Sequence, residues 1–132
     1  MRMHYRLLVT TRQVGSSFEV RRHVSAWLSR NGLLIDPDTR WSGGIADWYV
    51  IGGRWTGDLS GISDAEWRDR YRGFPLGYED DAQLVTEALY DRFLAEYEND
   101  VADWSSFVDL EDEPVTRAFI GRKWLVVIDY HR

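Results

Sequence analysis

Hydrophobic and polar positions alternate along four stretches of the chain, and each alternation predicts a β-strand. Residues 4–11 and 123–130 become apolar on both faces, which is typical of central strands covered on both sides. Residues 45–51 form an aromatic and β-branched run that stops at a glycine pair. A Gly121-Arg122 turn predicts that residues 115–120 pair with the last strand as a hairpin.

Helical periodicity predicts three further elements. Ser16 and Glu19 have capping-box spacing, so a helix is expected from Ser16 to a stop at Asn31-Gly32. A short helix is expected from Ser63, and the longest from residue 80 or 81 to 97, while residues 99–113 look irregular. The apolar positions of the first helix are Phe18, Val20, Val24, Trp27 and Leu28.

These elements predict one α+β domain over residues 1–132. The length suits a single hydrophobic core, and the 44% hydrophobic content is enough to fill it. We expect a mixed, mostly antiparallel sheet with helices packed on one face. A ferredoxin-like relative, with insertions between the second strand and the final hairpin, is the expected topology.

Charge and composition narrow the classes of partner. The net charge of −6 opposes a general role in binding duplex nucleic acid. A local basic patch stays open around Arg21, Arg22, Arg30 and Arg40. No apolar run is long enough for a membrane span or a signal peptide, and cysteine is absent, so we expect a cytoplasmic protein without disulfides or thiolate metal sites.

The strongest candidate site is the run Asp47-Trp48-Tyr49-Val50-Ile51-Gly52-Gly53-Arg54-Trp55-Thr56-Gly57, where a strand ends in a glycine-rich loop. Glycine amides approach a ligand closely, arginine binds phosphate or carboxylate, and tryptophan stacks on a ring. The alternative is a tight turn whose arginine pairs with a carboxylate and whose tryptophan fills the core. The ligand-binding candidates are Gly52, Gly53, Arg54, Trp55, Gly57, Asp47, Tyr49 and Trp41.

A second candidate set lies at the last strand. Asp129 and His131 share one face by alternation, and His4 joins them if the first and last strands are neighbours. Such groups can act as acid and base, so a small hydrolase or lyase beside Arg54 is one alternative function. A frayed terminus with a solvated histidine is the other interpretation.

Metal and cofactor chemistry finds no support in the sequence. Asp36, Asp38 and Asp47 superficially resemble a calcium loop, but Arg40 stands where a further ligand is needed. The glycine loop lacks the patterns of a P-loop or a dinucleotide fingerprint. We therefore expect neither a metal nor a cofactor.

The run from Asp47 to Gly57 resembles a motif of small bacterial and phage-encoded proteins that have no established activity. Some of them also end on a hydrophobic strand similar to Val126-Val127-Ile128-Asp129-Tyr130-His131. The resemblance covers these two short segments and implies that both belong to one site. Its phage association favours an antagonist of host defence that sequesters a signal or blocks an enzyme.

The leading hypothesis is a protein that binds a small anionic, nucleotide-like ligand, in one version a phage or mobile-element protein sequestering a nucleotide signal. Whether it is also an enzyme stays open. A third hypothesis is a protein-interaction or inhibitor module that uses exposed tryptophans, such as Trp41, Trp67 or Trp104. A homo-oligomer or a protein partner also stays open.

Overall fold

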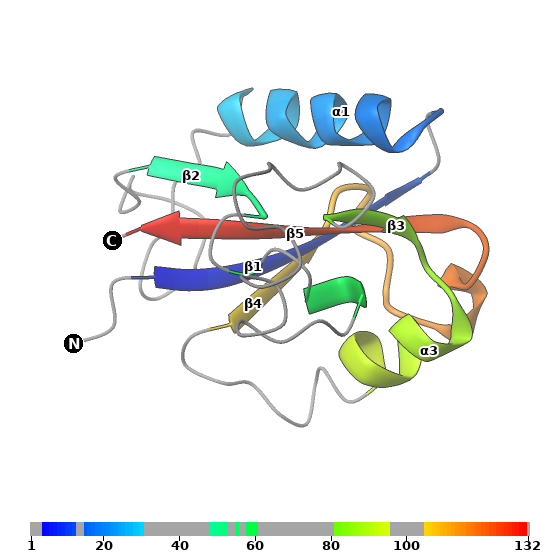
Figure 1. Cartoon of the computed structure of the whole chain (residues 1–132). Coiled ribbons are helices and arrows are strands. Elements are labelled where there is room, and N and C mark those ends of the chain that lie inside the picture. The colour runs from blue at the N-terminus through cyan, green and yellow to red at the C-terminus, as the bar shows by residue number, and fades with distance from the viewer. Residues whose placement is uncertain are drawn as a thin grey trace.

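The computed structural model describes residues 4–12, 15–30, 48–52, 55, 58–60, 81–95 and 105–131, without the side chains of residues 4, 48–50 and 131. Within these ranges a mixed sheet lies between two helical layers (Figure 1). The helical elements are α1 (Ser17–Arg30), η2 (Asp58–Ser60), α3 (Glu87–Leu89), the π-helix η4 (Tyr90–Leu94) and η5 (Arg117–Phe119). The strands are β1 (His4–Arg12), β2 (Trp48–Ile51), β3 (Ala82–Leu84), β4 (Ser105–Asp109) and β5 (Lys123–His131).

The last strand lies inside the sheet, as its two-faced apolar pattern predicts. The strand order is β2-β5-β1-β4, and β3 also pairs with β5. β5 is antiparallel to β1, β2 and β3, whereas β1 and β4 are parallel. All four other strands therefore run in one direction, and β5 runs against them.

β2 and β3 are two segments of one interrupted edge strand. Both pair with β5 in the same direction, β2 opposite residues 128–131 and β3 opposite residues 124–126. Between them, Gly52 donates its N–H to the carbonyl of Val127, and the N–H of Val127 donates to the carbonyl of Asp81. The chain thus leaves the sheet after Gly52 and returns to the neighbouring position at Asp81.

Alternation along β1 and β5 divides the core into two clusters. The first core cluster lies under α1, and the second core cluster lies on the opposite face under α3 and η4 (Figure 1). Buried members of the first are Leu7, Val9, Val20, Val24, Leu28, Ala82, Val126, Ile128 and Tyr130. Those of the second are Leu8, Leu59, Val85, Leu89, Leu94, Phe119, Leu125 and Val127.

The predicted first helix is confirmed, including its start. The amide of Glu19 donates to the Ser16 hydroxyl at 3.4 Å, and Val20 donates to the Ser16 carbonyl at 2.9 Å. The first bond satisfies an amide group that the first helical turn would otherwise leave unpaired, and the second is the first backbone bond of the helix itself. Asn31 and Gly32, the expected stop, lie outside the described residues.

Three sequence-based element predictions are wrong. Residues 82–84 of the expected longest helix form β3, and the helix begins only after Thr86, whose hydroxyl accepts from the Leu89 amide. Residues 117–119 form η5 instead of a hairpin strand, so β5 pairs with β1, β2 and β3. Residues 105–109, expected to be irregular, form β4.

The α+β class and the mixed, mostly antiparallel sheet are confirmed. The expected helical layer on one face is α1, and the structure adds the short α3–η4 segment on the other face. The ferredoxin-like relationship is not confirmed. Within the described part of the chain, no helix is long and apolar enough to cross a membrane.

Candidate functional site

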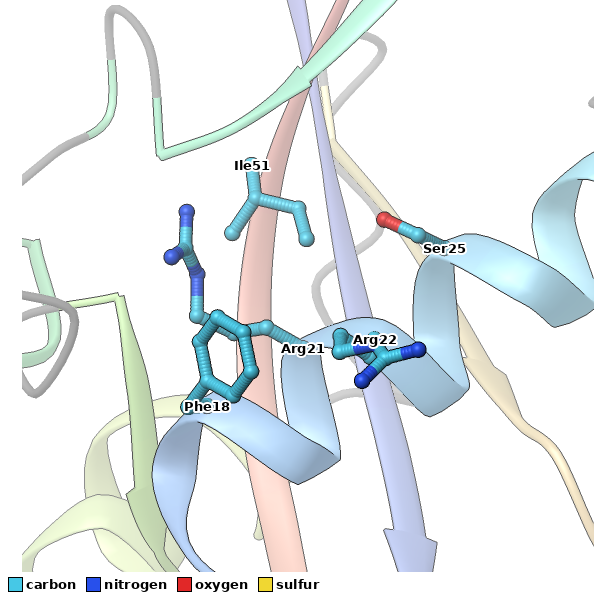
Figure 2. Close-up of a pocket in the computed structure, with 5 residues that line it drawn as sticks. All are labelled: Phe18, Arg21, Arg22, Ser25 and Ile51. Carbon is cyan, nitrogen blue, oxygen red and sulfur yellow. The ribbon is translucent and has the colours of Figure 1, made fainter.

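An open pocket of about 310 Å³ lies between the N-terminal half of α1 and the end of β2. Its lining combines an aromatic ring, two guanidinium groups, a hydroxyl and an aliphatic side chain: Phe18, Arg21, Arg22, Ser25 and Ile51. Figure 2 shows the Ser25 hydroxyl and the Ile51 side chain directed into the space between helix and strand. The Arg21 side chain reaches up beside Ile51.

The helix supplies four of these residues because they share one stripe. Positions 18, 21, 22 and 25 follow the i, i+3, i+4, i+7 spacing that brings side chains together on a helix surface. This stripe is offset from Val20, Val24 and Leu28, which are fully buried against the sheet. α1 therefore uses one face for the core and its flank for the pocket.

Phe18 belongs to the pocket rather than to the core where the sequence pattern placed it. Its side chain is 48% exposed, and it is the one large hydrophobic side chain exposed in the described ranges. The guanidinium carbon of Arg22 lies 5.9 Å from the centre of the Phe18 ring, which is a cation–π contact. A cation and an aromatic face are thus already paired at the pocket.

The pocket adjoins the start of the predicted glycine loop. Ile51 is the last residue of β2, and Gly52 follows it with a φ of 80°. This left-handed conformation is readily adopted by glycine and turns the chain away from the sheet. Gly52 is buried, and its amide donates to Val127 rather than to a ligand.

Trp55 contributes to packing. Its amide donates to the Gly52 carbonyl at 2.9 Å, and its half-buried side chain packs against the second core cluster, on the sheet face opposite α1. This agrees with the alternative in which the tryptophan fills the core. Gly53, Arg54 and Gly57, like Asp47 and Trp41, lie outside the described residues.

The backbone brings the histidines together as expected. β1 and β5 are neighbours, and His4 lies opposite His131, which also pairs with Trp48 of β2. Tyr49 lies opposite Tyr130, whose ring stacks on Tyr5 at 5.3 Å. β2 therefore pairs with the last four residues of β5, its start lying opposite the end of β5 and its end opposite Ile128.

Asp129 lies in the protein interior. It is 2% exposed and stands opposite Arg6 on β1. Arg6 in turn donates to the Ser105 hydroxyl at 3.1 Å and to the Asp58 carboxylate at 2.8 Å. Asp129 therefore belongs to a polar row across the sheet, and this row ties η2 to β1 and β4.

A second charged cluster, which sequence analysis missed, lies at the other end of β5. Lys123 is 1% exposed and donates to Asp109 at 3.0 Å and to Glu111 at 2.7 Å. Burial alone would lower the pKa of Lys123, but the hydrogen bonds to Glu111 and Asp109 and their negative charge raise it above its ordinary value. Lys123 is therefore charged, which suits a structural ion cluster.

The pocket residues had one signal in the sequence. Arg21 and Arg22 were noted as part of a basic patch, but the stripe formed with Phe18 and Ser25 was not recognised. Ser25 carried no signal of its own. The signal that would have identified the stripe is an aromatic residue outside the 20-24-28 register of the buried face, followed three and four residues later by arginines.

Among the described residues, no group of three histidine, aspartate or glutamate side chains is arranged to hold a metal ion. No protein-family model, curated protein or solved structure matches the chain.

Proposed function

We propose that the protein binds a small anionic, nucleotide-like ligand in the pocket between α1 and the end of β2. The observation that carries the proposal is the lining itself, in which two arginines and a hydroxyl share a space of about 310 Å³ with Phe18 and Ile51. That volume falls at the lower end of the range for small-molecule sites, roughly 300–1,000 Å³.

The charge distribution supports an anion at this place. The chain carries a net charge of −6, yet this flank of α1 presents Arg21 and Arg22 side by side in sequence. Guanidinium groups bind phosphate and carboxylate through two parallel hydrogen bonds and stay charged at all relevant pH values. The Ser25 hydroxyl adds a donor or acceptor that can orient the ligand.

The position also supports the proposal. Ile51, which lines the pocket, is part of the D-W-Y-V-I-G-G-R-W-T-G run that sequence analysis singled out. The ligand would therefore lie where that strand ends and its loop begins. Sequestration of a nucleotide signal by a phage or mobile-element protein is the biological version of this proposal, and it rests on the resemblance of two short segments.

Titration of the protein with phosphate- and carboxylate-bearing small molecules tests this proposal. The measured quantities are the affinity by calorimetry and the melting temperature. A bound ligand at a hundredfold excess over its Kd stabilises the folded state by about 2.7 kcal/mol, which raises the melting temperature by several degrees. The double variant Arg21→Ala/Arg22→Ala should weaken binding at least tenfold, because each charge-assisted hydrogen bond contributes about 1.5–3 kcal/mol.

Arg122→Ala is the control for the single variants Arg21→Ala and Arg22→Ala. Arg122 is exposed in the turn before β5, outside the pocket lining, so the same loss of one positive charge should leave the affinity unchanged. If the pocket variants and the control lose the same amount of affinity, only the overall charge of the protein matters. Binding that survives the double variant unchanged would refute the assignment of the site.

A further inference from the structure

We infer that the pocket takes a single nucleotide unit, with the base on Phe18 and one phosphate on the guanidinium groups of Arg21 and Arg22. This inference rests on the proposed function and narrows it from anions in general to mononucleotides. It excludes sugar phosphates, dicarboxylates and dinucleotides as the preferred ligands.

The first reason is the position of Phe18. A single exposed hydrophobic residue is ordinary on a protein surface. Phe18, however, is 48% exposed at the wall of a pocket that also holds two cations. A ligand that was only anionic would leave this ring in water, whereas a base stacked on it removes apolar area from solvent on both partners.

The second reason is the contact between Arg22 and Phe18. At 5.9 Å the guanidinium covers the ring in a surface cation–π contact, an interaction that is weak where water reaches it. A base can replace the guanidinium on the ring. Arg22 would then exchange a weak contact with Phe18 for a charge-assisted hydrogen bond to the phosphate of the same ligand.

The third reason is size. A space of about 310 Å³ is small for a ligand with two bases and two phosphates. Among the described lining residues Phe18 is the only aromatic side chain, so these residues offer a stacking partner for one base. One ring and one phosphate match the Phe18 ring and the Arg21 guanidinium group, which Figure 2 shows beside Ile51. Arg22 turns to the phosphate once a base has taken its place on the ring.

A calorimetric comparison of five ligands tests the inference: AMP, UMP, ribose 5-phosphate, inorganic phosphate and NAD. AMP and UMP should bind at least tenfold more tightly than ribose 5-phosphate, because stacking of the base adds roughly this factor or more. Phe18→Leu keeps an apolar side chain without a ring and should abolish the difference. Phe18→Tyr keeps the ring and should preserve it.

The outcomes separate the inference from the proposed function. If ribose 5-phosphate binds as tightly as AMP, or if Phe18→Leu retains the preference for AMP, the base does not stack on Phe18 and the inference is wrong while anion binding stands. If NAD binds more tightly than AMP, the size argument is wrong. If no phosphate or carboxylate ligand binds at all, the proposed function fails together with the inference.

Discussion

Lys123 shows how one buried residue joins three strands. Its ammonium group bonds the carboxylates of Asp109, at the end of β4, and of Glu111, while Thr10 and Thr11 of β1 donate their hydroxyls to the same two carboxylates. The Lys123 side chain also lies 5.0 Å from the Phe119 ring centre. The cluster therefore fixes the ends of β1 and β4 against the start of β5.

Replacing this lysine should destabilise the fold strongly. Lys123→Met removes the cation but leaves Asp109 and Glu111 as neighbouring negative charges, Asp109 being 7% exposed. Breaking a buried ion pair from one side costs about 3–5 kcal/mol. Urea unfolding should show this loss, whereas Arg117→Met, which removes exposed ion pairs with Glu87 and Asp91, should cost less than about 1 kcal/mol. Similar losses of stability in Lys123→Met and Arg117→Met would contradict the structural role of the Lys123 cluster.

The same cluster predicts how stability depends on pH. Burial raises the pKa of Glu111, but hydrogen bonds from Lys123, Thr11 and the Arg12 amide outweigh it, so the pKa lies below its ordinary value of 4.5. The folded protein then binds fewer protons than the unfolded chain near this pH. The stabilisation is present above the unfolded-state pKa and is lost as the pH falls through the lower folded-state pKa.

We therefore expect Glu111→Gln to reduce the dependence of the free energy of unfolding on pH in the acid range. The free energy of unfolding, measured by urea titration from about pH 6 to about pH 3, should fall less in this variant than in the wild-type protein. Glu87→Gln, at an exposed carboxylate, serves as the control and should retain the wild-type slope. A wild-type slope in Glu111→Gln would show that Glu111 is not the group being titrated.

At the scale of secondary structure, the interrupted edge strand brings the pocket and the loop together. β2 ends at Ile51 because Gly52 adopts a φ of 80°, which turns the chain away from the sheet, while its amide still bonds the carbonyl of Val127. Ile51 is thereby held at the wall of the pocket. The backbone conformation of one glycine thus positions a side chain that lines the pocket.

Gly52→Ala tests this coupling. A left-handed conformation costs a non-glycine residue about 1–2 kcal/mol, so thermal or urea unfolding should show a loss of that size. Gly121 also has a positive φ, 75°, and its added Cβ would meet open space, so Gly121→Ala should cost a similar amount. Only Gly52→Ala should also weaken ligand binding, because Gly121 lies outside the pocket lining. Equal affinities in the two variants would argue against a positioning role for Gly52.

Elements with a strong local pattern were predictable, and those set by distant pairing were not. α1 has its own cap and apolar stripe, while β1 and β5 are apolar on both faces, so local sequence identifies all three. Residues 82–84 are helical by periodicity, yet Ala82 and Leu84 form ladder pairs with β5. β4 is short and polar, and only its parallel pairing with β1 makes it a strand.

The sequence pointed to the neighbourhood of the pocket but not to the residues that line it. One wall is Ile51, the residue before the predicted glycine loop, but none of the five described lining residues was a predicted ligand-binding residue. The opposing wall comes from α1, about thirty residues earlier in sequence. No local pattern indicates that a helix flank and a strand end will meet, since their contact depends on how α1 crosses the sheet.

On the scale of the whole molecule, the two faces of the sheet carry different features. The face under α1 carries the pocket at its margin. The opposite face holds the second core cluster, with Trp55 and the polar row of Arg6, Asp58 and Ser105. The pocket on one side is therefore separated by the sheet from the packing that anchors η2.

The contrast between a negative molecule and a locally positive pocket predicts a salt effect. Raising the ionic strength from about 0.01 M to about 0.15 M shortens the screening length from about 30 Å to about 8 Å. The affinity for a phosphate ligand should fall over this range as the attraction to Arg21 and Arg22 is screened. An uncharged nucleoside, measured in parallel, should show little change, and equal salt effects on both ligands would contradict a charge-based interaction.

The exit of the chain at Gly52 and its return at Asp81 have an evolutionary consequence. Both points lie on Val127, so a change in the length of the chain between them need not shift the register of any strand. Doubling the length of such an excursion adds only about 0.6 kcal/mol of closure entropy. This position is thus a natural place for related chains to diversify, and for an engineer to graft a foreign peptide, while the sheet beneath keeps its pairing.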